Sequence, residues 1–238
     1  MSYIHDLVSR NKEDLVDLYE EGYTVSSIPD YIKGSIKVCE AQAIYCIIKD
    51  RKYKNILDIG TGPGFSCLYM AKALEDSETK GKVTTIDINE EFVLKSKSLI
   101  NKFNLREYVN YVCGDSSEVL SKMPDASFDL TIIDGNHKYD QCKKDFENAY
   151  RLIAPGGCIV FDDIYYRPEN NPGPRNVFEE SVHLASESYF FEEETFNLFQ
   201  YSEDLSEIVR MRNKWDDTNE RFVLKKSNTK EVMGFLFK

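Results

Sequence analysis

The sequence predicts an α/β fold in which a doubly wound, mostly parallel sheet carries helices on both faces. Five short apolar runs begin about 20–30 residues apart, as the strands of successive βαβ units do. Some of them, such as Cys158–Phe161, are continuously apolar, which is typical of strands covered on both faces. Between the runs, apolar residues recur at helical spacing. This alternation indicates right-handed βαβ units and a parallel sheet.

The five runs give the predicted strands, and the segments around the first two give helices. The strands are Lys54–Asp58, Lys82–Asp87, Val109–Cys113, Phe128–Asp134 and Gly157–Asp162. Upstream of them we expect a short helix at Lys12–Gly22, a loop at Tyr23–Gly34 and a helix at Ser35–Ile48. Asn89 is a suitable N-cap for the helix that contains Phe92, Leu99, Ile100 and Phe103.

The second half of the chain is less regular. A helix containing Cys142, Phe146 and Tyr150 is expected to stop before Pro155-Gly156-Gly157. Three prolines predict a loop at Tyr165–Arg175, and its position directly after the fifth strand predicts that it covers a bound ligand; an ordinary exposed connection is the alternative. A helix near Val177–Glu187 and a last strand at Glu231–Phe237 follow, and Asp204–Asp217 fits either a helix or a hairpin.

Length and composition limit the class of protein. The 238 residues suit one domain, which we place at 35–238, preceded by an N-terminal helical and loop cap over 1–34. An apolar fraction of 42% and a charged fraction of 30% exclude a disordered chain. The net charge of −11 disfavours a nucleic-acid partner. No apolar run approaches the ~20 residues of a membrane span, and the N-terminus lacks the pattern of a secretory signal.

The six cysteines are scattered and contain no Cys-x-x-Cys pair, so we expect all of them to be reduced. Together with the charge, this indicates a cytoplasmic protein that acts on a small molecule and binds neither nucleic acid nor a membrane. A homodimer remains open.

A glycine-rich turn follows the first predicted strand. Asp58-Ile-Gly-Thr-Gly-Pro-Gly64 ends a strand and opens a helix, at the edge of the sheet where α/β proteins bind ligands. Phe65 stands where a dinucleotide fingerprint needs its last glycine, and the lysine of a phosphate-binding loop is absent. A plain tight turn is the alternative.

Carboxylates at neighbouring strand ends favour a binding site over a plain turn. Asp87 ends the second strand, where an acidic side chain can accept both hydrogen bonds of a ribose diol. Asp115 follows the third strand and can accept a hydrogen bond from the amino group of a base. Asp58 ends the first strand. One such aspartate is often only a cap, but three of them beside a glycine turn line one crevice.

These motifs resemble those of the class I S-adenosylmethionine-dependent methyltransferases, over roughly Ser35–Asp163. The resemblance implies a Rossmann-like fold and S-adenosylmethionine as the cofactor. It assigns the methionine part to the glycine turn and the ribose to Asp87, with Asp115 and Ser116 at the adenine. The implied cofactor-binding residues are Asp58, Gly60, Thr61, Gly62, Gly64, Asp87, Ile88, Asp115, Ser116 and Asp134.

A second cluster of carboxylates narrows the chemistry. Asp134 ends the fourth strand, and Asp162 and Asp163 end the fifth, so the three side chains should meet. Clustered carboxylates repel one another unless a cation neutralises them, and an oxygen-only set suits Mg²⁺, Ca²⁺ or Mn²⁺. Helix capping, or a contact of Asp134 with the cofactor alone, is the alternative.

The pattern resembles the metal-dependent O-methyltransferases that act on catechol, caffeoyl-CoA and macrolide sugars. The first two branches have a lysine base three positions after the first aspartate, where this chain has His137. They also have asparagine where this chain has Asp163, so their acceptors are not implied here. The resemblance implies methyl transfer to a hydroxyl, with His137 and Asp134 as the catalytic pair. The alternatives are a metal-independent N- or carboxyl-methyltransferase and a cofactor-binding module without catalysis.

Overall fold

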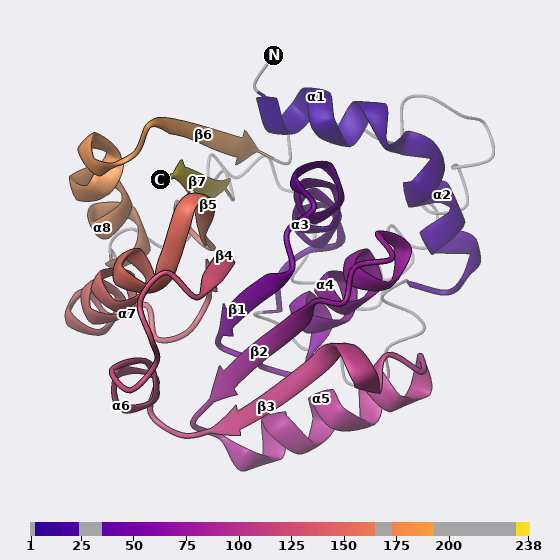
Figure 1. Cartoon of the computed structure of the whole chain (residues 1–238), viewed down its shortest axis with the longest axis horizontal. Coiled ribbons are helices and arrows are strands. Elements are labelled where there is room, and N and C mark those ends of the chain that lie inside the picture. Colours follow the sequence, from indigo (N-terminus) through magenta and orange to yellow (C-terminus); the bar gives the residue numbers. More distant parts are fainter. Residues whose placement is uncertain (1–2, 24–34, 165–172, 193–231) are drawn as a thin grey trace, which may run out of the picture.

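The computed structural model describes residues 3–23, 35–164, 173–192 and 232–238. These residues form a seven-stranded sheet with the order β3-β2-β1-β4-β5-β7-β6 (Figure 1). Strands β1 to β5 run parallel, and β7 pairs antiparallel with both β5 and β6. The strand bounds are β1 Asn55–Ile59, β2 Lys82–Asp87, β3 Val109–Cys113, β4 Phe128–Ile133, β5 Ile153–Phe161, β6 Glu187–Glu192 and β7 Val232–Phe237.

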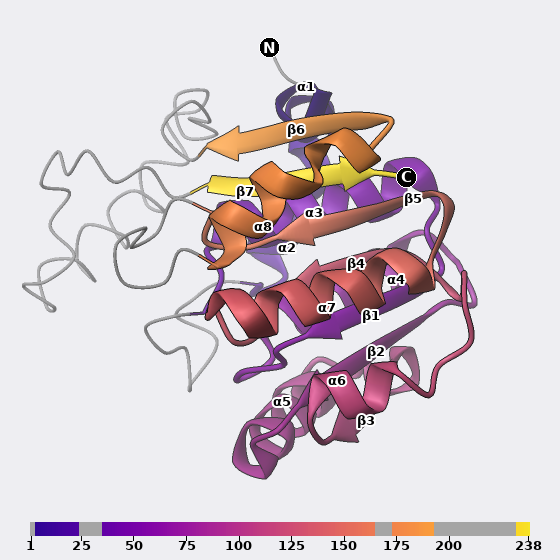
Figure 2. The ribbon, with the colours of Figure 1, turned by 90° about the vertical axis from the view of Figure 1, so that its left-hand side faces the viewer.

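Helices cover the sheet on both faces, as the sequence predicts. Helices α3 to α5 pack on one face, whereas α6 to α8 lie on the other, in front of the sheet in Figure 2. The helix bounds are α1 Tyr3–Arg10, α2 Lys12–Glu20, α3 Val38–Arg51, α4 Phe65–Asp76, α5 Glu90–Lys102, α6 Ser116–Leu120, α7 Tyr139–Leu152 and α8 Gly173–Ser181. Three-residue 3₁₀ turns occupy Arg106–Tyr108 and Val182–Leu184.

The two faces of the sheet bury separate apolar clusters. Along β5, Cys158 and Val160 join the cluster under α3 to α5, and Ile159 and Phe161 join the cluster under α7 and α8. Strand side chains alternate between the two faces of a sheet, so a central strand that is buried on both sides must be apolar throughout. The continuous apolar run on which the fold prediction depended has this cause.

Three predicted boundaries are wrong. Helix α3 starts at Val38, where the Glu40 carboxylate accepts a hydrogen bond from the Lys37 N–H, and it extends to Arg51. Strand β5 begins at Ile153, because Gly156 adopts a φ of +81° and lets the chain continue through an irregular pairing with β4. Helix α8 spans Gly173–Ser181 and not Val177–Glu187. It has a proline at its second position, so the last three residues of the expected loop are helical, and Glu187 belongs to β6.

Some of the other predicted elements are confirmed, and some fall on residues that the structure does not describe. The helix predicted at Lys12–Gly22 is confirmed as α2, and the final strand as β7. The rest of the loop expected at Tyr165–Arg175, the loop over 24–34 and the region Asp204–Asp217 lie outside the described residues. Sequence analysis missed α1 and β6. All six cysteines are free, as expected, and Cys113 is exposed.

The N-terminal helices pack on α3 and α4 and share their apolar cluster. Lys49 on α3 forms an ion pair with Asp14 at 2.8 Å. Lys72 on α4, only 11% exposed, lies 3.0 Å from Glu21 and 2.8 Å from Asp76. A nearly buried ammonium held by several carboxylates fixes the end of α2 against α4. The division of the chain at residue 34 stays a prediction, since that position is not described.

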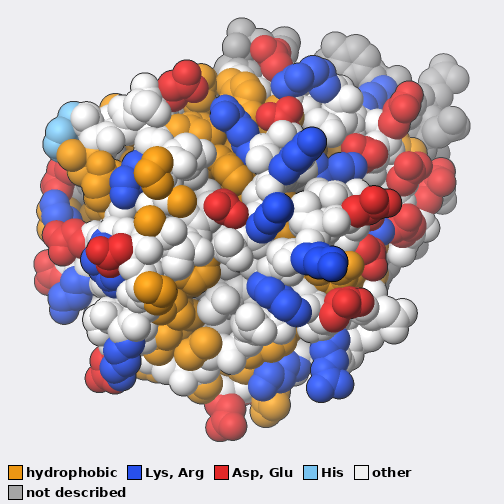
Figure 3. All heavy atoms as spheres, in the orientation of Figure 1, with side chains coloured by type: hydrophobic (Ala, Val, Ile, Leu, Met, Phe, Trp, Pro, Cys, Tyr) orange, Lys and Arg blue, Asp and Glu red, His pale blue; other side chains and the backbone are white. Residues whose placement is uncertain are grey.

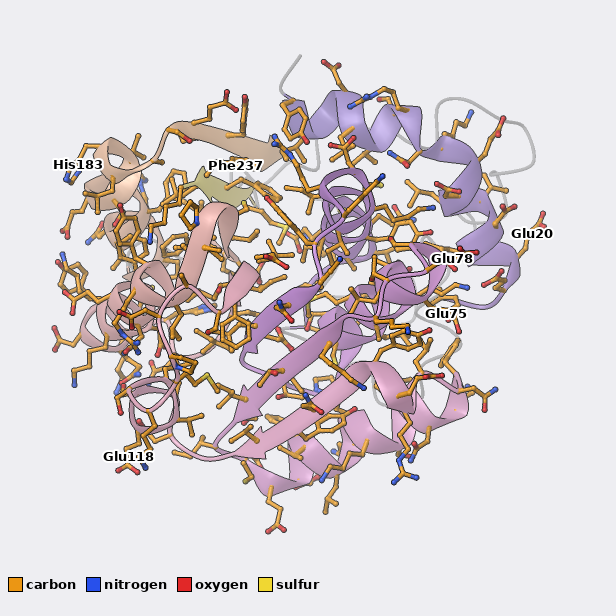
Figure 4. All side chains as sticks on the ribbon, viewed as in Figure 1. Glu20, Glu75, Glu78, Glu118, His183 and Phe237 are labelled. Carbon is orange, nitrogen blue, oxygen red and sulfur yellow. The ribbon has the colours of Figure 1, made fainter. Side chains whose placement is uncertain are left out.

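The surface carries both signs of charge. Figure 3 shows Lys and Arg side chains interspersed with Asp and Glu over the face viewed in Figure 1. His183 is exposed at the outside of the molecule (Figure 4). Among the described residues, no helix has the length and apolar character needed to cross a membrane.

Candidate active site

A cleft of about 500 Å³ opens at the carboxyl ends of β1, β2, β3 and β4. The strand order reverses between β1 and β4, which is the place where open α/β sheets bind their ligands. The cleft is lined by Ser35, Ile36, Ile59, Gly60, Thr61, Gly62, Pro63, Phe65, Ser66, Ile86, Asp87, Ile88, Phe92, Gly114, Asp115, Ser116, Asp134, Gly135, Asn136 and Gln141. Most of the predicted cofactor-binding residues are therefore brought together.

The turn after β1 needs glycine at its first position. Gly60 has a φ of +104°, and a side chain there would collide with the backbone carbonyl of Asp134. Its N–H donates to the Ile86 carbonyl at 2.9 Å, so the turn is tied to both neighbouring strands. Gly62 also has a positive φ, but a side chain there would enter open space. Because the space beside Gly62 is open, a ligand can approach the backbone there closely.

Asp87 holds the turn and faces the cleft. Its Oδ2 accepts the Gly62 N–H at 3.0 Å, and its Oδ1 accepts the Asn89 N–H at 2.8 Å. Each carboxylate oxygen has a second lone pair, so both can still accept from a diol. Beside it, Ile88 is 73% exposed and Phe92 borders the same cleft, which provides apolar surface for a flat base.

Asp58 lies beneath the cleft and not on its surface. The side chain is fully buried, and its carboxylate accepts hydrogen bonds from Thr85 at 2.7 Å and from Ser66 at 3.5 Å. Burial raises the pKa of Asp58 to about 7, although the Thr85 hydrogen bond works against this. Thr61 reaches the same group through Thr85, at 2.6 Å between the hydroxyl oxygens. The predicted contact of Asp58 with the cofactor stays a prediction.

At the far end of the cleft, Asp115 and Ser116 begin α6. Asp115 caps the helix, with Oδ1 accepting the N–H of Glu118, whose side chain points outward (Figure 4). The Ser116 hydroxyl donates to Oδ1 of Asp145 on α7 at 2.7 Å. Gln141, also on α7, donates to the same carboxylate at 3.1 Å. Burial raises the pKa of Asp145, and these two hydrogen bonds oppose the shift.

His137 lies between two carboxylates, one of which, Asp134, lines the cleft. Its Nε2 is 3.5 Å from Oδ1 of Asp134, and its Nδ1 is 3.6 Å from Oδ2 of Asp163. Burial alone would lower the pKa of His137, but the nearby carboxylate of Asp134, with the charge of Asp163, raises it overall. Burial raises the pKa of Asp134, and His137 counteracts this. At this distance the contact is an ion pair when the imidazole is protonated, and Nε2 makes no hydrogen bond with the described residues.

Asp162 adds a further acidic group behind this pair. It is 3% exposed, and its Oδ1 has no hydrogen-bond partner within the described residues. Burial, followed by the charges of Glu40, Asp134 and Asp163, raises the pKa of Asp162 well above its ordinary value. Asp163 has a φ of +54°, a conformation that few residues other than glycine adopt and that turns the chain sharply after β5.

The predicted cation ligands are of a suitable type but do not surround one point. Asp134, Asp162 and Asp163 supply the oxygen donors that Mg²⁺ and Ca²⁺ prefer, and the unpartnered Oδ1 of Asp162 suits an ion. Within the described part of the chain, however, no group of three or more His, Cys, Asp or Glu side chains is arranged to hold a metal. The imidazole of His137 occupies the space between Asp134 and Asp163.

Sequence analysis missed several residues of this site. Gln141 and Asp145 are on α7, and only the tertiary fold brings them to α6. Their spacing of four residues places both on one helix face, but the same spacing is common on solvated helices. In the sequence, Glu40 is an ordinary acidic residue in the first turn of a helix. Its charge raises the pKa of Asp162 only because the fold brings α3 close to the end of β5.

The comparisons agree with the fold. Residues 57–164 match a family described as "Methyltransferase domain". The match covers less than half of the chain, and the sheet order is that of a Rossmann-like fold.

Curated relatives include methyltransferases of more than one kind. A putative O-methyltransferase of Mycobacterium avium is 34% identical over 108 residues, which cover 45% of this chain and 46% of that protein. A ubiquinone/menaquinone biosynthesis C-methyltransferase of Rickettsia bellii is 32% identical over 114 residues, 46% of this chain and 45% of that protein. The chain thus spans about half the length of these relatives.

Solved structures share the fold across nearly the whole chain. The O-methyltransferase of Bacillus cereus, in complex with S-adenosylhomocysteine, gives a TM-score of 0.61 at 18% identity and covers 96% of this chain and 91% of that one. TomG of Streptomyces achromogenes, an O-methyltransferase of tomaymycin synthesis solved with S-adenosylmethionine, gives a TM-score of 0.61 at 18% identity and covers 95% and 89%.

Proposed function

We propose that this protein transfers the methyl group of S-adenosylmethionine to a hydroxyl group of a small-molecule acceptor. The observation that carries the proposal is the position of Asp134. Its backbone packs against the glycine turn at Gly60, and its carboxylate lies 3.5 Å from His137. The cleft that suits the cofactor therefore ends at a candidate base.

The cofactor assignment is supported by the chemistry of the cleft wall. The exposed turn backbone at Gly62 can approach the methionine part, and Asp87 can accept from both ribose hydroxyls. Ile88 and Phe92 offer apolar contacts to the base. The O-methyltransferases with the same fold were solved with S-adenosylmethionine or its demethylated product.

In the proposed reaction, the acceptor oxygen attacks the methyl carbon while the carbon–sulfur bond breaks. The positive charge of the sulfonium disappears as S-adenosylhomocysteine forms, and the hydroxyl proton passes to His137. Asp134 and Asp163 flank the imidazole and stabilise its charged form. A neutral hydroxyl is a poor nucleophile, so a positioned base contributes substantially to the rate.

The proposal includes a divalent cation held by Asp134, Asp162 and Asp163, with Mg²⁺ as the first candidate and Ca²⁺ or Mn²⁺ as alternatives. When bound, such an ion would lower the pKa of the acceptor hydroxyl and orient it. The oxygen-only donor set and the unpartnered Oδ1 of Asp162 support this part of the proposal.

The second candidate is a metal-independent methyltransferase in which His137 alone serves the acceptor. The observation that favours it is the position of the imidazole. The ring lies between Asp134 and Asp163, in the place where a cation would otherwise neutralise the two carboxylates. This version extends to nitrogen and carboxylate acceptors. A C-methyltransferase also matches 46% of the chain, which is compatible with an accepting atom other than a hydroxyl oxygen. A cofactor-binding module without catalysis remains the third possibility.

The remaining parts of the proposal concern the setting of the reaction. We propose a small-molecule acceptor and no nucleic-acid partner, which the net charge of −11 supports. We also propose action in the cytoplasm, which the free cysteines support, and no membrane partner, since no apolar run of the sequence reaches the length of a membrane span. A homodimer is compatible with these features.

An assay of S-adenosylhomocysteine formation over a panel of phenols, alcohols, amines and carboxylic acids tests the function. Each acceptor is assayed in EDTA and again after addition of excess Mg²⁺, Ca²⁺ or Mn²⁺. Turnover of a hydroxyl acceptor that requires the ion supports the cation-assisted reaction. Equal turnover in EDTA selects the metal-independent candidate, and cofactor binding without turnover of any acceptor favours the non-catalytic module.

A further inference from the structure

The hydrogen bonds at the α6 end of the cleft engage the side-chain donors of Ser116 and Gln141. The Ser116 hydroxyl donates to Oδ1 of Asp145 at 2.7 Å. Gln141 Nε2 lies 3.1 Å from the same oxygen, 3.2 Å from Ser116 Oγ and 2.9 Å from Ser117 Oγ. Asp145 is 1% exposed, so its carboxylate is satisfied by these neighbours and not by solvent.

This arrangement fixes the orientation of the Gln141 amide. An ionised carboxylate can only accept hydrogen bonds, so the nitrogen of Gln141 must face Asp145. The two N–H groups are shared among three acceptors. Oε1 takes part in no hydrogen bond with any other residue that the structure describes, and Gln141 borders the cleft.

The cleft therefore presents hydrogen-bond acceptors at this end. The hydroxyl proton of Ser116 is directed to Asp145, which leaves the oxygen as an acceptor. The Asp115 carboxylate accepts as well, and Oε1 of Gln141 adds a neutral acceptor. A base with an exocyclic amino group matches such a surface, whereas a carbonyl oxygen at the same position would meet acceptors without a hydrogen between them.

We propose that Gln141, held in place by Asp145, selects a cofactor whose base carries an exocyclic amino group and rejects its 6-oxo counterpart. The inference rests on the proposed function, since it takes the ribose at Asp87 and the base beyond it. Gln141 is the specificity-determining residue, and Asp145 is a positioning residue that acts through it.

Calorimetric binding of S-adenosylhomocysteine and of S-inosylhomocysteine tests the proposal. The second ligand differs only in carrying oxygen in place of the adenine amino group. The wild type should prefer S-adenosylhomocysteine by at least about tenfold. Gln141→Met, which keeps the length but removes the acceptor, should lose most of this preference. Asp145→Asn should reduce it too, because an amide at 145 lets the Gln141 amide turn over.

Ser117→Ala is the matched control. It removes one partner of the same amide nitrogen but leaves Asp145 in place, so the preference should persist. Thermal melting confirms that each variant folds, and Gln141→Met carries the test if Asp145→Asn does not. Equal affinities in the wild type, or an unchanged preference in Gln141→Met, would overturn the inference alone. Failure of the wild type to bind S-adenosylhomocysteine would overturn the proposed function together with it.

Discussion

Nε2 of His137 lies 3.5 Å from Oδ1 of Asp134, three residues earlier in the chain. Asp134 directly follows β4, and His137 directly precedes the Lys138 cap of α7, so the β4–α7 connection fixes their separation. Asp163 completes the arrangement from the end of β5. The chain thus builds its candidate base and the base's orienting partner within one loop.

Replacement of His137 should affect the chemical step and not cofactor binding. His137→Ala should lower kcat by about 10²–10⁴-fold, the usual range for a lost general base. Because no cofactor contact is assigned to the imidazole, the affinity for S-adenosylhomocysteine should change less than about twofold. Single-turnover kinetics with saturating acceptor, together with calorimetry, measure the two effects. An unchanged kcat would remove His137 from the mechanism.

The raised pKa of His137 predicts a pH dependence. The imidazole acts as a base only when neutral, so activity should rise with pH and level off above the raised pKa. Asp163→Asn removes one of the charges that raise the pKa, and the rising limb should move to lower pH. A pH profile of kcat/KM for both proteins provides the comparison. A limb at the same pH in both proteins would contradict the assignment.

The buried carboxyl of Asp58 predicts a pH-dependent stability. With a folded-state pKa of about 7 against an ordinary value of 3.8, the folded protein keeps a proton that the unfolded chain has lost between these pH values. The free energy of unfolding should therefore fall as pH rises through this window, by at most about 1.4 kcal/mol for each pH unit from this group.

Asp58→Asn removes that titration while it retains an acceptor for Thr85 and a donor for Ser66. The free energy of unfolding of the variant, minus that of the wild type, should therefore increase as the pH is raised from 5 to 8. Chemical denaturation at several pH values measures the difference. A difference that stays constant with pH would show that Asp58 remains ionised throughout.

Two glycines of the turn should respond differently to alanine. Gly60→Ala places a methyl group against the Asp134 carbonyl in a conformation that disfavours side chains. We expect a loss of about 1–3 kcal/mol from the backbone conformation and a similar loss from the collision. Gly62→Ala meets open space, so only the backbone cost applies. Apo-protein melting separates the two, and equal losses would contradict the close packing at Gly60.

The sequence predicts the strand ends well because a parallel sheet brings them to one edge. Asp87, Asp115 and Asp134 could be placed at the cleft from strand order alone. The bridging position of His137 could not, because it depends on the left-handed turn at Asp163. Strand β6 is missed for a related reason, since β7, the strand with which it pairs, lies about 40 residues further along the chain.

Side chains that meet across helices were beyond sequence reasoning as well. Asp145 looks like a surface residue of an amphipathic helix, yet it is buried against Ser116 of α6. Asp58 is the first residue of the glycine-turn motif, yet it lies under the cleft. Side chains alternate along a strand, and its neighbours Leu57 and Ile59 point to the opposite face of the sheet. Such placements depend on packing between elements that are distant in sequence.

The central claim is that the cleft binds S-adenosylmethionine with its ribose on Asp87. Asp87 also holds the N–H groups of Gly62 and Asn89, so Asp87→Ala should both loosen the turn and leave the diol without acceptors. The most direct test is calorimetric titration of S-adenosylhomocysteine into the wild type, Asp87→Asn and Asp87→Ala.

The account predicts that Asp87→Ala weakens binding by about tenfold or more, which corresponds to ~1–3 kcal/mol, with a smaller loss in Asp87→Asn because it keeps one acceptor oxygen. Equal affinity in all three proteins, or no binding by the wild type, would contradict it.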